Sequence, residues 1–184
     1  MVSSGGYENI DWGILPESDA IRRRHEFRYR TAAEFAYGLT VDAACGFGCG
    51  SLLLADKADT VVGFDRDSNA LDVAQRYYDY VPQHIMEFHC ADLDKLELPP
   101  CHYLVCIETL EHLHAPRDFL AKAMSSADRI FLSVPIIPTK QRNQYHLHDF
   151  TFNEVLSWFD ENWKQLFIAT QEGTYGLVCY ERRQ

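Results

Sequence analysis

Basic residues, long apolar runs and closely paired cysteines are all scarce or missing in this sequence. Its 17 lysines and arginines stand against 27 acidic residues, which leaves a net charge of −10 over 184 residues. Such a charge repels phosphate backbones at long range, so an extended nucleic-acid partner is not expected. No apolar stretch approaches the roughly 18 residues that a membrane span requires, so a membrane partner is not expected either.

The six cysteines contain no Cys-x-x-Cys pair, the spacing typical of structural zinc sites. We therefore interpret them as buried thiols in a reducing compartment. The first ten residues, MVSSGGYENI, carry neither the basic nor the apolar region of an export signal, so we expect a cytoplasmic protein. Residues 1–17 are predicted to be a flexible N-terminal segment, and residues 18–184 a single domain.

Short apolar runs alternate with helical periods along the rest of the chain. Strands are predicted at 39–45, 60–65, 84–92, 102–108, 129–135, 167–171 and 175–183. Helices are predicted from Ser18, through 51–57, after a Ser68 cap, from Pro116, and over 152–163 after a Thr151 cap. This alternation is typical of a single Rossmann-like α/β domain, a seven-stranded, mostly parallel sheet with helices on both faces. The last two strands have no helix between them and are predicted to form a C-terminal antiparallel hairpin.

The first predicted strand leads into a glycine-rich turn, in the run VDAACGFGCGS at 41–51. Gly46 and Gly48 permit a tight turn and a close approach of the backbone to a ligand. In such sheets, ligands bind beyond the carboxyl ends of the strands, so this turn belongs at the binding edge. Taken alone, the turn also suits a nicotinamide dinucleotide.

Three aspartates follow successive predicted strands, and together they narrow the choice of ligand. Asp42 beside the turn would repel a pyrophosphate, but it can accept a hydrogen bond from an amino group or order a water. Asp65, 19 residues after Gly46, can bind both hydroxyls of a ribose. Asp92 can accept a hydrogen bond from the exocyclic amine of adenine. The three acids favour an adenosyl ligand that carries an amino acid, with the dinucleotide as the alternative.

Four segments, VDAACGFGCGS, VVGFD, CADLDKLELP and YLVCIETLEHL, together resemble the class I S-adenosylmethionine-dependent methyltransferases. The resemblance extends to HEFRYRTAAEFAYG and NQYHLHDFTFNEVLSWF and covers roughly residues 20–170. Within that class, the segments are most similar to ubiquinone-biosynthesis O-methyltransferases and sugar-cluster methyltransferases. The motifs are specific for the cofactor and carry no information on the methyl acceptor.

The resemblance implies S-adenosyl-L-methionine as cofactor and S-adenosyl-L-homocysteine as product. The expected cofactor-binding residues are Arg28, Asp42, Ala44, Gly46, Gly48, Asp65, Arg66, Asp92, Leu93, Ile107 and Glu108. Among them, Asp65 is assigned to the ribose, Asp92 and Leu93 to adenine, and Ile107 and Glu108 to the methionine side.

Two of these assignments depend on features that the sequence does not determine. Arg28 is the candidate for the cofactor carboxylate, with a solvated helix face as the alternative. Ala44 stands where the family most often has glycine, a change that is tolerable if its φ is negative.

Histidines gather in two segments that follow the fourth and fifth predicted strands. Methyl transfer from a sulfonium is an in-line displacement that often requires removal of a proton from the acceptor, and histidine suits that task. We expect O-methylation of a small hydroxylated acceptor such as a sugar, a phenol or a secondary metabolite, with His112 or His146 as the proton acceptor. The acceptor pocket is expected to be open to solvent, or completed by the N-terminal segment or by the partner in a homodimer.

The run from Glu108 to His112 also has the composition of a metal site. If it forms a helical turn, Glu108, Glu111 and His112 share one face and could hold a divalent ion, with His146 or His148 as a fourth ligand. Ubiquinone-type and small-RNA 2′-O-methyltransferases are similar at this motif. The favoured interpretation is nevertheless a metal-free turn that shapes the pocket. Two alternative functions remain: metal-assisted 2′-O-methylation of a short RNA end, and a non-catalytic cofactor-binding module that regulates a partner.

Overall fold

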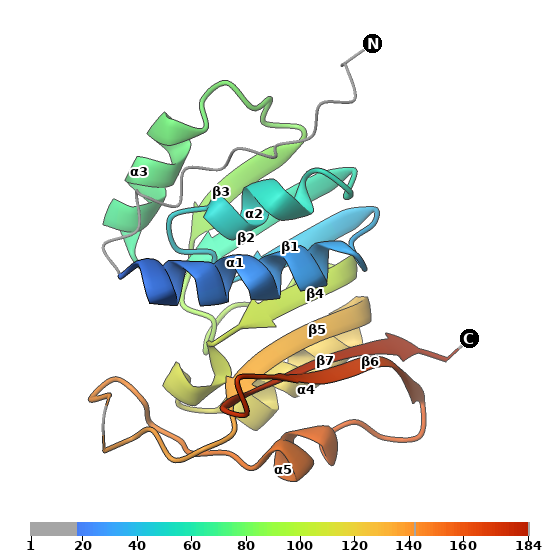
Figure 1. The fold of residues 1–184 in the computed structure, drawn as a ribbon. Coiled ribbons are helices and arrows are strands. Elements are labelled where there is room, and N and C mark those ends of the chain that lie inside the picture. The colour runs from blue at the N-terminus through green and yellow to red at the C-terminus, as the bar shows by residue number, and fades with distance from the viewer. Residues whose placement is uncertain (1–17, 142, 184) are drawn as a thin grey trace.

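A seven-stranded sheet forms the centre of the computed structural model, which describes residues 18–141 and 143–183 (Figure 1). The strand order is β3-β2-β1-β4-β5-β7-β6. The strands are β1 (Leu39–Ala43), β2 (Thr60–Asp65), β3 (Met86–Cys90), β4 (Cys101–Ile107), β5 (Ala127–Pro135), β6 (Trp163–Gln171) and β7 (Tyr175–Arg182). Neighbouring strands from β3 to β5 are parallel, and β7 is antiparallel to both β5 and β6. The predicted fold, including the C-terminal hairpin, is confirmed. The segment 1–17 lies outside the described residues.

Helices cover both faces of this sheet. They are α1 (Asp19–Ala33), α2 (Cys49–Leu54), α3 (Ser68–Tyr77), α4 (Pro116–Ser126), α5 (Phe152–Leu156) and the short 3-10 helix η2 (Leu110–His112). Side chains of α1, α2 and α3 pack in one buried cluster, and those of α4 and α5 pack in another. No helix among the described residues is long and apolar enough to cross a membrane.

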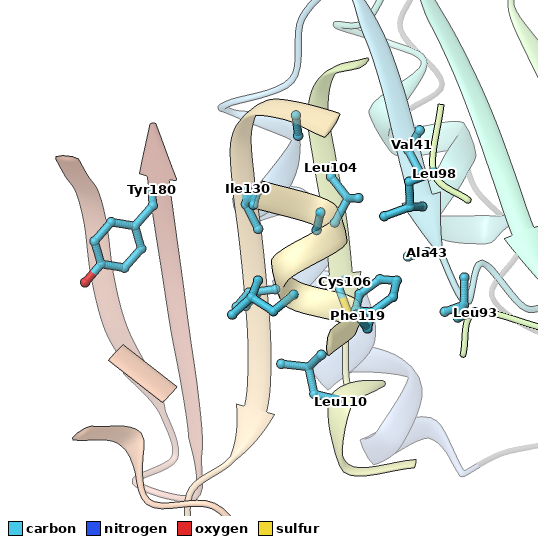
Figure 2. Close-up of a cluster of buried hydrophobic side chains, with 14 of the residues drawn as sticks. Val41, Ala43, Leu93, Leu98, Leu104, Cys106, Leu110, Phe119, Ile130 and Tyr180 are labelled. Atoms are coloured by element: carbon cyan, nitrogen blue, oxygen red, sulfur yellow. The ribbon is translucent and has the colours of Figure 1, made fainter. Parts of the chain in front are cut away.

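The two clusters follow from the period of two in the strands. On β4, Tyr103 and Val105 belong to the α1 side, whereas Leu104 and Cys106 belong to the α4 side, because successive side chains point to opposite faces. Figure 2 shows part of the second cluster, in which Phe119 of α4 lies among the strand residues. Burial on both faces explains why this strand is a continuous apolar run in the sequence.

Two helix boundaries differ from the prediction: the N-terminus of α3 and the C-terminus of α5. The N-cap of α3 is Asp67 instead of Ser68, because its carboxylate accepts from the backbone N–H groups of Asn69 and Ala70. Thr151 caps α5 as predicted, accepting from Glu154 N. That helix ends at Leu156, well short of the predicted 163, because a turn around Asp160 starts β6 there.

Candidate active site

Two neighbouring cavities open at the carboxyl ends of the parallel strands. The smaller cavity, about 260 Å³, is lined by the end of β2, by segments that follow β1, β2, β3 and β4, and by Tyr145 from the loop after β5. The larger cavity, about 580 Å³, is lined by α1, by η2, by the loop that follows β5 and by the start of β7. Glu108 and His112 line both cavities, so the two spaces meet at these residues.

The glycine-rich turn is held by Asp65 at the end of β2. Gly46 N donates to Asp65 Oδ2 at 2.8 Å, and Asp67 N donates to Oδ1 at 2.9 Å. A carboxylate has about four acceptor positions, so Asp65 can still bind hydroxyls in the smaller cavity that it lines. Gly48 has a φ of 76°, and an added Cβ would lie 2.6 Å from Phe88 Cζ, so this position requires glycine on both counts.

Ala44 lines the smaller cavity in a strained conformation. Its φ is 64°, in the left-handed region, and the condition under which alanine would be harmless here is therefore not met. A non-glycine residue in this region costs about 1–2 kcal/mol. The turn keeps this conformation because Cys45 N, immediately after it, donates to Phe64 O on β2.

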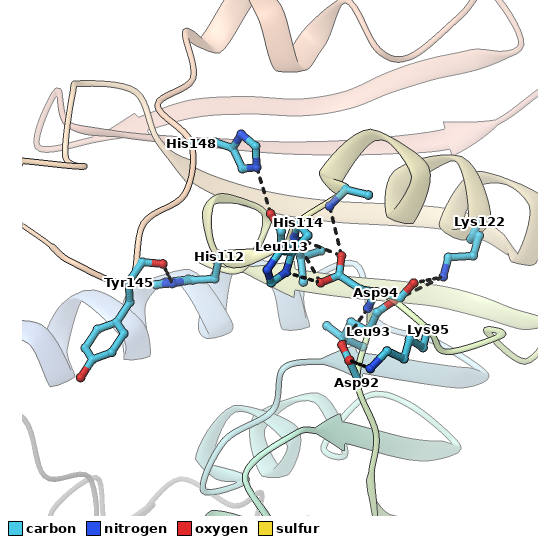
Figure 3. Close-up of polar contacts among 11 residues, drawn as sticks. Asp92, Leu93, Asp94, Lys95, His112, Leu113, His114, Lys122, Tyr145 and His148 are labelled. Atoms are coloured by element: carbon cyan, nitrogen blue, oxygen red, sulfur yellow. Dashed lines mark hydrogen bonds and ion pairs between the residues drawn. The ribbon is translucent and has the colours of Figure 1, made fainter.

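The loop that follows β3 brings two aspartates to the smaller cavity. Asp92 accepts from Lys95 Nζ at 2.9 Å, and that hydrogen bond lowers the pKa of its carboxyl. Asp94, which the sequence analysis did not single out, accepts from the backbone N–H groups of His114 and Ala115 (Figure 3). Burial opposes the ionisation of Asp94, but these hydrogen bonds outweigh it and lower its pKa. Asp94 thereby joins this loop to the start of α4.

Several predicted cofactor residues line neither cavity. Asp42 is fully buried: Tyr29 Oη donates to its Oδ1 at 3.0 Å and Ser51 Oγ to its Oδ2 at 2.6 Å. Burial raises the pKa of Asp42 to about 7. Asp42 therefore joins α1 and α2 to β1, beneath the turn. Among the described residues, Gly46, Gly48 and Ile107 are likewise absent from both linings, whereas Arg66 and Leu93 line the smaller cavity.

Arg28 reaches the larger cavity from α1, and its side chain is buried, which excludes a solvated helix face. Its Nε donates to Gln171 Oε1 at 2.8 Å, and its guanidinium lies 4.0 Å from the centre of the Tyr175 ring. Its Nη1 lies 3.8 Å from Glu108 Oε2. Its Nη2 has no hydrogen-bond partner within the described part of the chain. A buried cationic donor is thus left available to an anion.

Glu108 is held at the boundary of the two cavities by β5. Its backbone N donates to Ser133 O at 3.0 Å, and Ser133 Oγ donates to its Oε1 at 2.8 Å. Burial raises the pKa of Glu108, although the charge of Arg28 acts in the opposite direction.

Glu111, His112 and His146 form a cluster at the larger cavity. One potential ligand atom from each residue lies within 4.8 Å of the others, and the two imidazole rings stand edge to face with centroids 4.6 Å apart. Glu111 is 1% exposed, and neither carboxylate oxygen has a hydrogen-bond partner among the described residues. Burial raises its pKa well above the usual value, and the charge of Glu108 adds to that effect. Burial lowers the pKa values of both histidines.

His148 is not part of this cluster. Its Nε2 donates to Leu113 O at 3.0 Å (Figure 3). Its ring stacks on Phe150. Of the two histidines considered as a fourth metal ligand, the structure brings His146 to Glu111 and His112. Glu108 is engaged by Ser133 and Arg28, because η2 begins only at Leu110 and the predicted helical turn does not include residue 108.

Comparison with known proteins places this geometry in a family. Residues 41–127, which carry the segments around the smaller cavity, match the family model described as a methyltransferase domain. The chain carries an S-adenosylmethionine-dependent methyltransferase domain on a Rossmann-like methyltransferase fold. No curated protein sequence matches the chain.

The methyltransferase is similar in fold to several solved structures of low sequence identity. N-methyltransferase NodS from Bradyrhizobium japonicum, in complex with S-adenosyl-L-homocysteine, superimposes with a TM-score of 0.75 at 14% identity, over 97% of this chain and 94% of that one. Magnesium protoporphyrin IX methyltransferase from Synechocystis gives 0.70 at 16% identity, over 91% and 90%. Small RNA methyltransferase HEN1 gives 0.72 at 16% identity, over 92% of this chain but 26% of that chain.

Proposed function

We propose that this methyltransferase transfers the methyl group of S-adenosyl-L-methionine to a hydroxyl oxygen of a small acceptor, such as a sugar, a phenol or another hydroxylated metabolite. The observation that carries the proposal is the meeting of the two cavities at Glu108 and His112. The adenosyl part of a methyl donor in the smaller cavity and an acceptor in the larger cavity would meet there, with the amino-acid end of the donor extending to Arg28 in the larger cavity. The resemblance to ubiquinone-biosynthesis and sugar-cluster methyltransferases supports an acceptor of this size.

The residues of the smaller cavity fit the adenosyl part of the cofactor. Asp65 offers free acceptor positions to the ribose hydroxyls, and Asp92 with Leu93 would receive the adenine. The carboxylate of the amino-acid end would pair with Arg28 Nη2, which is buried and has no other described partner. An anion at this point would satisfy a donor that is otherwise costly to bury. Asp42 and Gly46 act indirectly, since they hold the turn.

His112 is the better defined proton acceptor of the two histidines. Its Nδ1 lies 3.0 Å from Tyr145 O, and because a carbonyl only accepts, Nδ1 carries the proton. In the neutral ring Nε2 therefore keeps its lone pair, and the lowered pKa keeps the ring neutral near pH 7. The bound cofactor supplies an electrophilic methyl on a sulfonium; the O–C bond forms as the S–C bond breaks. His112 Nε2 takes the hydroxyl proton.

A second candidate is the same reaction assisted by a divalent cation, and Glu111 is the observation that favours it. A buried carboxylate without a partner costs several kcal/mol. An ion held by Glu111, His112 and His146 would remove that penalty, and a donor set of one carboxylate and two imidazoles suits a transition ion such as Mn²⁺ or Zn²⁺ better than Mg²⁺. Such an ion lowers the pKa of a bound hydroxyl. A short RNA end is then an alternative acceptor, and the fold likeness to a small RNA methyltransferase is compatible with it.

A methyl-transfer screen with the full chain tests the proposal. Pools of sugars and phenols and a short RNA are each assayed with and without a chelator. Turnover on a small hydroxyl that ignores the chelator and is lost in His112→Ala supports the metal-free reaction. Chelator-sensitive turnover that Mn²⁺ or Zn²⁺ restores, and that Glu111→Gln abolishes, supports the cation.

The exposed His114 gives a matched control, and His114→Ala should keep its turnover. Turnover that survives both His112→Ala and His146→Ala contradicts the proposed chemistry. Binding of S-adenosyl-L-homocysteine without turnover on any acceptor would favour the non-catalytic regulatory module.

A further inference from the structure

A chain of hydrogen-bonding groups in the loop that follows β5 ends on His146. Thr139 Oγ1 lies 2.6 Å from His146 Nδ1 and 3.4 Å from Asp149 Oδ1. The same Asp149 oxygen accepts from Thr139 N at 2.6 Å and from Lys140 N at 3.1 Å. Asp149 thus closes the loop on itself and places a negative charge behind the Thr139 hydroxyl.

We propose that Thr139 and Asp149 are positioning residues that hold the proton of His146 on Nδ1 and so leave Nε2 with its lone pair. The inference rests on the proposed function, in which His146 serves at the larger cavity as a second base or as a cation ligand. Neither residue touches the reacting atoms; both act through the imidazole of His146.

The direction of the Thr139 hydroxyl proton decides the tautomer. A hydroxyl donates one proton, so Thr139 can donate to Asp149 or to His146. An ionised carboxylate is the stronger acceptor, since hydrogen bonds to charged groups are roughly twice as strong as neutral ones. With the hydroxyl proton on the Asp149 side, Thr139 Oγ1 accepts from Nδ1–H of His146 across the shorter contact.

His112 provides an independent parallel for this arrangement. Its Nδ1 is bonded to Tyr145 O in the same loop, so both imidazoles are held through Nδ1 by one segment. That segment is fixed against η2, because Leu147 N donates to Glu111 O at 2.7 Å. Two Nε2 lone pairs lie beside Glu111, and its buried carboxyl adds further acceptor positions once it is ionised. Such a site suits an incoming hydroxyl proton or a cation, and metal-bound histidines are commonly oriented by a hydrogen bond to the other ring nitrogen.

The tautomer can be measured without knowing the acceptor. ¹⁵N-histidine NMR of the full chain above about pH 8, with His146→Ala to identify the signals, reports which nitrogen of His146 is protonated. We expect Nδ1–H in the wild type and in Thr139→Ser, which keeps the hydroxyl. In the isosteric Thr139→Val, we expect the ratio of the two tautomers to change about tenfold, equivalent to about 1.4 kcal/mol. Protonation at Nε2 in the wild type, or an unchanged ratio in Thr139→Val, overturns the proposal.

The tautomer of His112 serves as an internal control, since its Nδ1–H bond to Tyr145 O should persist if the loop stays folded. A turnover assay separates this inference from the proposed function. Loss of kcat in Thr139→Val with an unchanged KM for the cofactor, rescued in Thr139→Ser, supports the positioning role. If His146→Ala keeps full turnover, the proposed role of His146 fails whatever its tautomer. If His146→Ala is inactive but the tautomer does not respond to Thr139→Val, the positioning role alone fails.

Discussion

The two cavities differ in how their charged groups are satisfied. At the smaller cavity the carboxylates have partners: Asp65 accepts two backbone N–H groups, and Asp92 pairs with Lys95. At the larger cavity, ionisable groups are buried with partners missing in the described structure, namely Arg28 Nη2 and both oxygens of Glu111. Buried polar groups without partners are rare because they lower the stability of the fold. Their presence here therefore indicates a binding role. The smaller cavity is preformed, whereas the larger one is completed by what it binds.

The largest effect should separate chemistry from cofactor binding. His112→Ala removes the proposed base, and turnover should fall by about 100- to 10,000-fold. The affinity for S-adenosyl-L-homocysteine, measured by calorimetry, should change little, because the adenosyl contacts lie elsewhere in the smaller cavity. A parallel loss of affinity and turnover would show that cofactor binding and proton removal are not carried out by separate residues.

Asp65→Ala should give the converse result. Two charge-assisted hydrogen bonds to the ribose, each contributing about 1.5–3 kcal/mol, would be lost, and the affinity should fall at least about 100-fold. Loss of the Gly46 contact adds to this effect. Asp72→Ala on the exposed side of α3 is the matched control and should bind normally. Calorimetry that finds equal affinities in the two variants refutes the ribose assignment.

The pH dependence of stability tests whether Asp42 belongs to the scaffold under the turn. Burial raises its pKa from 3.8 to about 7, so between these values the folded protein keeps a proton that the unfolded chain has lost. Stability should therefore fall as pH rises through this window, by a few kcal/mol, and level off above it. Urea unfolding at about pH 5 and pH 8 should show a smaller difference in Asp42→Asn than in the wild type. Identical differences would place the carboxylate in a more solvated position.

The smallest effect concerns the strained alanine. Ala44→Gly relieves about 1–2 kcal/mol of left-handed strain but adds about 0.5–1 kcal/mol of unfolded-state entropy, so the free energy of unfolding should rise by up to about 1.5 kcal/mol. Ala91 lines the same cavity without a positive φ, and Ala91→Gly should destabilise instead. If thermal unfolding shows a higher melting temperature for Ala91→Gly than for Ala44→Gly, residue 44 is not strained.

The sequence predicts the residues of the smaller cavity better than those of the larger one, because the strand next to each residue in the sequence determines its position. Asp65 is the last residue of β2 and Asp92 lies two residues after β3, so strand periodicity with parallel topology suffices to bring them to one edge. The positive φ of Ala44 is set by the hydrogen bond from Cys45 N to Phe64 O on another strand. No local pattern in the sequence signals that contact.

The larger cavity depends on contacts between distant segments. Arg28 is buried by Gln171 and Tyr175, about 143 residues further along the chain. Alternation in an extended loop allowed either His146 or His148 to reach Glu111, and only the hydrogen bond of His148 to Leu113 decides between them. For Asp94, the only sequence feature that could have indicated a role at the site is its spacing of two residues from Asp92. Its hydrogen-bond partners at the start of α4 are brought to it by the tertiary fold.

A crystal structure of the protein with S-adenosyl-L-homocysteine tests most directly whether the cavities divide donor from acceptor. The adenosine should lie between Asp65 and Asp92 in the smaller cavity, the carboxylate should bond Arg28 Nη2, and the sulfur should lie beside Glu108 and His112 and face the larger cavity. A ligand whose sulfur faces away from the larger cavity, or whose amino-acid end fills the space between His112 and His146, would contradict the division.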